Sequence, residues 1–168
     1  MESRAPGRRI AVIAGTRPEA IKLAPVVRAL RADPAGYEVA LIASGQHEQL
    51  TLETLSGFDL TPDVALTVPA NTRDLAELSG HMLLSLKRTI IDLKPDLTIV
   101  QGDTATTFTG ALAAYYGQVP IAHVEAGLRT GDIGDPFPEE GYRKMIGAIT
   151  RLHFAPTERA RHALLGEG

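Results

Sequence analysis

The stretch that decides the fold is residues 96–127, DLTIVQGDTATTFTGALAAYYGQVPIAHVEAG. Two short apolar runs, 96–103 and 120–127, flank a longer segment, 104–117, that is rich in alanine and threonine. Short runs that are apolar nearly throughout are typical of parallel strands covered on both faces, and the longer segment has a helical pattern. The stretch therefore predicts a β–α–β unit with two parallel strands.

The same alternation continues on both sides of this unit. Further apolar runs predict strands at 9–15, 37–44, 63–68 and 152–157. The segments between the strands predict helices at 18–32, 48–56, 74–93 and 138–150, and a last helix at 159–168. Repeated β–α units with right-handed crossovers predict an α/β fold built on a Rossmann-like, doubly wound parallel sheet.

Composition narrows the class of protein. The chain has 168 residues, enough for one domain with a real core, and it is 44% apolar and 22% charged. A net charge of −3 argues against a nucleic-acid partner. The chain has no cysteine, which fits a reducing cytosol, and no run near the roughly 18 apolar residues that span a membrane. We expect a cytoplasmic domain at 9–168, without a membrane or nucleic-acid partner, behind a disordered lead-in at 1–8.

Polar, glycine-containing segments follow four of the predicted strands, at 15–17, 44–47, 101–104 and 125–127. In open α/β sheets, ligands bind at the carboxyl ends of the strands. The sequence therefore predicts that the functional residues gather at this side of the sheet.

Three acids from different segments are candidates for acid–base chemistry there. Asp103 could cap the next helix or serve as a catalytic carboxylate, and Glu125 could be paired with Arg129 or act in catalysis. Glu139 suits the first turn of a helix, where a pair with Arg143 four residues later is also available. Each acid alone fits a structural role, but three acids converging at one side of a sheet fit acid–base catalysis.

Cations and amides provide further candidates. Arg17 and Lys22 flank a strand-to-helix turn that could hold an anion, although a tight turn with two surface cations explains them equally well. Gln46, His47 and Gln49 lie at another strand-to-helix turn, where His47 could contact a ligand or be a capping or solvated group. His123 fits a buried, hydrogen-bonded histidine. The sequence contains no HxxxH pair or aspartate-rich loop that would predict a metal site, and no GxSxG nucleophile motif.

Several long motifs resemble those of one family. They are GTRPEAIKLAPV (15–26), SGQHEQL (44–50), QGDTATTFTGALAAYYGQVPIAHVEAGLRTGDI (101–133), PFPEE (136–140) and HFAPTE (153–158). In this order and spacing, they resemble the non-hydrolysing UDP-N-acetylglucosamine 2-epimerases from about residue 9 to the end.

The resemblance implies the N-terminal half of a GT-B-type two-domain fold, with the C-terminal nucleotide-binding domain absent from this chain. It implies conversion of UDP-GlcNAc to UDP-ManNAc without a cofactor, through loss of UDP to give 2-acetamidoglucal and re-addition of UDP. It also implies a homodimer of the complete protein, and a C-terminal domain or complementary subunit as partner. The residue roles that it implies are catalysis by Asp103, Glu125 and Glu139, substrate binding by Arg17, Lys22 and Arg143, and a second, allosteric UDP-GlcNAc site at Gln46 and Gln49.

The chain departs from the family pattern in the segment before the last motif. Gly134 and Asp135 stand where Tyr-Ser is expected before the proline, and Tyr142 stands where asparagine is expected before the helix arginine. We expect these positions in a loop over the substrate and activator sites, where they bear on allostery and on the choice of sugar. Two other functions fit the same fold: half of a GT-B glycosyltransferase, or a nucleotide-sugar-binding subunit without activity of its own.

Overall fold

The computed structural model describes residues 7–72 and 74–168. Its single sheet contains β1 (Arg8–Ala14), β2 (Tyr37–Ala43), β3 (Val64–Ala65), β4 (Leu97–Gln101), β5 (Ile121–Val124) and β6 (Leu152–Phe154). The strand order is β3-β2-β1-β4-β5-β6, and every neighbouring pair is parallel. This order reverses between β1 and β4, which is the point where ligands bind in doubly wound sheets.

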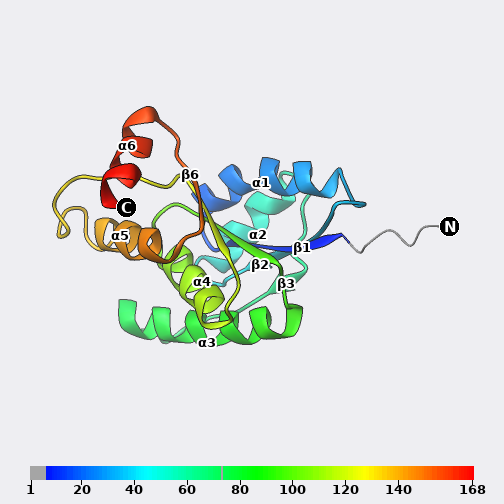
Figure 1. Cartoon of the computed structure of the whole chain (residues 1–168). Coiled ribbons are helices and arrows are strands. Elements are labelled where there is room, and N and C mark those ends of the chain that lie inside the picture. The colour runs from blue at the N-terminus through cyan, green and yellow to red at the C-terminus, as the bar shows by residue number, and fades with distance from the viewer. Residues whose placement is uncertain (1–6, 73) are drawn as a thin grey trace.

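Helices cover both faces of the sheet (Figure 1). They are α1 (Arg17–Arg31), α2 (Glu48–Ser56), α3 (Leu75–Leu93), α4 (Ala105–Tyr116), α5 (Glu139–Ile149) and α6 (Glu158–Glu167). On one face α1 and α2 bury Leu23 and Leu55 against the strands, and on the other α3 to α5 bury Met82, Leu86 and Ile146. The predicted Rossmann-like, doubly wound α/β fold is confirmed. Within the described residues, no helix combines the length and apolar character needed to cross a bilayer.

Every predicted strand and helix is present, and the differences lie at the ends. The predicted strand at 63–68 is reduced to the two residues of β3, because it pairs only with β2 at the margin of the sheet. Residues 1–6 of the expected lead-in lie outside the described residues, and β1 already begins at Arg8. The residues after Gln101 and Val124 leave the strands, so their side chains reach the site from loops.

A close approach of backbone and side chains brings the strand ends together at the switch point. Gly15 follows β1, and a Cβ atom there would lie 2.0 Å from both Ser44 Oγ and Thr106 Oγ1. Those two hydroxyls are 2.7 Å apart and join the end of β2 to the first turn of α4. The sequence therefore needs glycine at position 15, because any side chain would separate these elements.

Candidate active site

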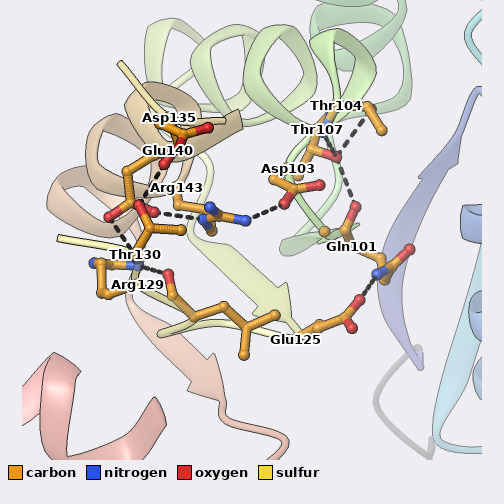
Figure 2. A network of polar contacts seen from close by, with 12 residues as sticks. Gln101, Asp103, Thr104, Thr107, Glu125, Arg129, Thr130, Asp135, Glu140 and Arg143 are labelled. Carbon is orange, nitrogen blue, oxygen red and sulfur yellow. Dashed lines mark hydrogen bonds and ion pairs between the residues drawn. The ribbon is translucent and has the colours of Figure 1, made fainter. Parts of the chain in front are cut away.

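Asp103 forms the first side of the site, in the loop between β4 and α4. Its Oδ2 atom lies 2.6 Å from Nη1 of Arg143, which projects from α5 (Figure 2). The predicted alternative, Asp103 as the cap of α4, is wrong: the cap is Thr104, whose hydroxyl accepts from the Thr107 N–H. Asp103 is thus directed toward α5 rather than committed to its own helix.

Glu140 lies behind Arg143 and is completely buried. Its Oε2 accepts from Arg143 Nε at 2.8 Å, while its Oε1 accepts from the Thr130 N–H at 3.2 Å. The predicted intrahelical pair of Arg143 with Glu139 is replaced by this pair with Glu140, because three residues along the helix bring Glu140 onto the same buried side. Burial raises the pKa of Glu140, but the hydrogen bonds from Arg143 and the loop N–H groups outweigh it and hold the pKa below its usual range. Glu140 therefore keeps its charge and anchors the guanidinium.

The neighbouring acids influence the protonation of Asp103. Burial is the largest cause that raises its pKa, and the Arg143 guanidinium opposes it. The carboxylates of Glu139 and Glu125 raise the pKa of Asp103 further, so all three acids lie within electrostatic reach of one another. An aspartate that retains its proton to higher pH than usual is suited to donate one.

Glu125 forms the second side of the site, immediately after β5. Its Oε2 accepts from Lys22 Nζ at 2.5 Å and from the side-chain amide of Gln101. Arg129, the partner predicted as an alternative, instead donates from Nε and Nη2 to the carboxylate of Glu167 at 2.8 and 2.7 Å. Glu125 also has a φ of 67°, a left-handed conformation that non-glycine residues rarely adopt and that tends to occur at functional sites.

Two polar atoms in this region lack a hydrogen-bond partner among the described residues. Oε2 of Glu139, at the start of α5, and Oε1 of Gln101, at the end of β4, are both buried and unpaired. Buried polar atoms normally find a partner, so such exceptions require an explanation. Both lie among the residues that surround Asp103 and Glu125, where a bound ligand or water could supply the missing contact.

Glu19 is a buried acid of this region that the sequence reasoning missed. Its carboxylate accepts from the Gly15 and Thr16 N–H groups at 2.7 and 2.8 Å, and from the Thr104 hydroxyl at 2.5 Å. It therefore ties the start of α1 to the start of α4, next to Asp103. Burial raises the pKa of Glu19, against the effect of these hydrogen bonds. The sequence does contain a pattern that indicates this role, because Thr16-x-x-Glu19 is a capping box.

The other predicted binding residues make no hydrogen bond or ion pair with the three acids among the residues that the structure describes. Arg17 is exposed and has no ion pair within the described ranges; it lines a groove of about 490 Å³ between α1 and α2. Gln46 Oε1 accepts from the N–H and hydroxyl of Thr106 at 2.9 and 2.7 Å, so it braces the first turn of α4. Gln49 is exposed and donates to Glu53 at 2.8 Å. Of the predicted binding residues, Lys22 and Arg143 thus contact the acids directly.

The positions that depart from the family pattern separate in space. Gly134 and Asp135 are exposed in the loop before α5, as expected. Tyr142 is not in that loop: it lies on α5, is 6% exposed, and stacks on Phe108 with ring centroids 4.8 Å apart. The expectation that Tyr142 covers the site is therefore wrong, because its ring forms part of the core between α4 and α5.

His123 is a core histidine, as predicted. It is 2% exposed, and its Nε2 bonds to the Gly102 carbonyl at 2.6 Å. Burial is the main cause that lowers the pKa of His123 to about 4, so the ring is neutral at pH 7. Among the described residues, no group of three or more histidine and acidic side chains is arranged to hold a metal ion.

Comparison with known proteins gives one consistent result. The family model for UDP-N-acetylglucosamine 2-epimerase matches residues 28–168. A probable UDP-N-acetylglucosamine 2-epimerase of Ralstonia solanacearum is 48% identical over 161 residues, which are 96% of this chain and 43% of the relative. The chain therefore spans less than half the length of the curated relatives that it matches.

Solved structures give the same picture. The S. aureus MnaA–UDP co-structure superposes with a TM-score of 0.91 at 45% identity, over 96% of this chain and 42% of that one. UDP-GlcNAc 2-epimerase from Neisseria meningitidis bound to UDP-GlcNAc superposes with a TM-score of 0.91 at 38% identity, over 95% of this chain and 43% of that one.

Proposed function

Because this chain belongs to the UDP-N-acetylglucosamine 2-epimerase family, we propose that it is the N-terminal half of an enzyme that converts UDP-GlcNAc to UDP-ManNAc. The observation that carries the proposal is the convergence of Asp103, Glu125 and Glu139 beside Arg143 and Lys22. Acids held together with cations match what this reaction demands of a protein.

The chemistry requires more than one proton transfer. The C2 proton of an N-acetylglucosamine ring is not acidic enough for simple removal, so the C1–O bond to UDP breaks first. UDP departs with the bonding electrons, a carboxylate then takes the C2 proton, and the C2–H electrons form the C1–C2 double bond of a bound 2-acetamidoglucal. UDP then adds back after C2 is protonated from the other face. This route needs an acid or base on each face of the sugar, and Asp103, Glu125 and Glu139 divide these transfers and the orientation of the groups.

Cations support departure of the diphosphate. Lys22 is half exposed beside Glu125 and can exchange part of that contact for a phosphate oxygen. Arg17 has no ion pair in the described part of the chain. It lies at the N-terminal end of α1, and the N-terminus of a helix favours anions. Arg143 is held by Glu140 and Asp103, so its contribution is to orient Asp103 toward the sugar.

Gln46 and Gln49 remain our proposal for a second UDP-GlcNAc site, with Gln46 linked to the first turn of α4.

The proposal includes a partner, since the chain covers 43% of a complete relative. A C-terminal nucleotide-binding domain or a complementary subunit completes a GT-B-type cleft, and the complete protein is a cytoplasmic homodimer. The 168-residue chain alone is expected to show little or no turnover. Calorimetric titration with UDP-GlcNAc, alone and with the complementary half, measures what each part contributes.

Exchange at C2 tests the reaction. The complete protein, incubated with UDP-GlcNAc in D2O, should yield UDP-ManNAc carrying deuterium at C2. Product without deuterium would rule out the mechanism. A glycosyltransferase would give little or no UDP-ManNAc when no acceptor is present, and a binding subunit would bind UDP-GlcNAc without converting it.

A further inference from the structure

Gln101 is a buried amide whose side chain makes one hydrogen bond within the described part of the chain. It ends β4, is 3% exposed, and donates from Nε2 to Glu125 Oε2 (Figure 2). Its Oε1 has no partner within the described residues. An amide that served only to stabilise the core would be expected to pair both ends, because an unpaired buried carbonyl is costly. The hydrogen bond to Glu125 is the contact within the described residues that calls for an amide at this position, and Oε1 stays open to a water or ligand.

The two donors to Glu125 act on the same oxygen. Lys22 Nζ and Gln101 Nε2 both contact Oε2, whereas Oε1 has no hydrogen bond from any described residue. Two donors on one oxygen fix the plane of the carboxylate and leave the other oxygen, Oε1, available. Since Lys22 is 47% exposed, it can move when an anion binds, but the buried Gln101 cannot easily do so.

The main chain beneath Gln101 is also held in place. The Thr107 hydroxyl lies 2.6 Å from the Gln101 carbonyl oxygen, and the same hydroxyl lies 3.0 Å from Glu19. The amide therefore projects from a rigid base toward a glutamate whose own backbone is in the left-handed region. Such support is what keeps a catalytic group within the narrow range of productive geometries.

We propose that Gln101 is the positioning residue of the site: its buried amide holds Oε2 of Glu125, so that Oε1 is the atom that exchanges a proton with the substrate. This inference rests on the proposed epimerase function and deepens it by assigning one oxygen of one acid. Gln101 itself does not touch the reacting atoms, and Lys22 is left free to follow the diphosphate.

Substitution of Gln101 in the complete protein tests the inference. Gln101→Met keeps most of the volume and removes the donor, so kcat for epimerisation should fall about 10- to 100-fold while KM changes less than about threefold. The melting temperature should not fall, since the variant also removes an unpaired buried carbonyl. Gln101→Asn keeps a shorter donor and should recover part of kcat. Thr98→Val, which removes another unpaired buried group of β4, is the control and should leave kcat unchanged.

Three outcomes would overturn the inference: full kcat in Gln101→Met, a parallel loss of kcat and melting temperature, or no recovery in Gln101→Asn. If the wild-type protein does not epimerise UDP-GlcNAc, the proposed function fails, and crystal structures of wild type and Gln101→Met decide the positioning role separately. A Glu125 carboxylate that is turned or disordered in the variant supports the role. An unchanged carboxylate refutes it.

Discussion

The two halves of the site hold their acids in different ways. The α5 half consists of Asp103, Glu140 and Arg143, whose side-chain exposures are 28%, 0% and 9%. The α1 half consists of Lys22, Gln101 and Glu125, and the exposures of Lys22 and Glu125 are 47% and 25%. Asp103 and Glu125 are about equally exposed, so the halves differ in their cations: Arg143 is buried between two carboxylates, whereas solvent or an anion can reach Lys22. We infer that one half provides stability and orientation, and the other adapts to the substrate.

The largest expected effect comes from breaking the α5 half. Glu140→Ala leaves the buried Arg143 with Asp103 alone and the Thr130 N–H without an acceptor. We expect a loss of about 3 kcal/mol in the free energy of unfolding, measured by denaturant titration. Glu38→Ala, which removes an exposed pair with Arg9, is the control and should cost less than about 1 kcal/mol. Equal losses would mean that burial does not distinguish the two kinds of pair.

The close approach of Gly15 to Ser44 and Thr106 gives the second largest effect. Gly15→Ala places a methyl group 2.0 Å from the hydroxyls of Ser44 and Thr106, so the ends of β1 and β2 must move away from α4. The expected loss is about 2 kcal/mol, seen as a lower melting temperature. Gly166→Ala in α6 meets no atom within 4 Å and should leave stability unchanged or slightly higher.

The pH dependence of stability reports on a buried histidine next to the α5 half. His123 supports the Gly102 carbonyl next to Asp103, and its pKa is lowered from 6.5 to about 4, chiefly by burial. The unfolded chain takes up the proton near pH 6.5 and the folded protein only near pH 4, so stability falls as pH drops through this window. Between pH 7 and pH 5 this group should account for a loss of about 2 kcal/mol.

The loss is measured as the difference between unfolding free energies at the two pH values. In His123→Gln it should shrink by about 2 kcal/mol, because that side chain does not titrate. Thr98→Val, in the neighbouring strand, should show the full wild-type loss. A wild-type loss that persists in His123→Gln would assign the pH dependence to other groups.

The smallest expected effect belongs to the α1 half. Lys22→Met removes a half-exposed ion pair with Glu125, so the free energy of unfolding should change by no more than about 0.5 kcal/mol. Under the proposed function, the same variant should nevertheless weaken binding of UDP-GlcNAc by the complete protein, as measured by calorimetry. A large loss of stability would instead mean that the Lys22–Glu125 pair stabilises the fold, as the pairs of the α5 half do.

The sequence by itself determined the layers and the location of the site. Apolar runs alternating with helical segments required a sheet covered on both faces, because each element has to bury its apolar surface. The residues that follow those runs had to meet at one side of the sheet, since parallel strands end together. Asp103 and Glu125 could be chosen on this basis, and the long motifs added the family.

Only the tertiary structure decided how the charges are paired. Glu125 binds Lys22, 103 positions away, and Asp103 binds Arg143, 40 positions away. Local spacing instead suggested Arg129 and Glu139 as partners, because a sequence pattern registers only neighbours along one element. The folded structure also buries Glu140 completely, unlike its neighbour Glu139, and places the ring of Tyr142 in the core. Contacts between elements decide which acid is fixed by an ion pair, which can reach a ligand and which only supports the fold. Those contacts form only when the chain has folded.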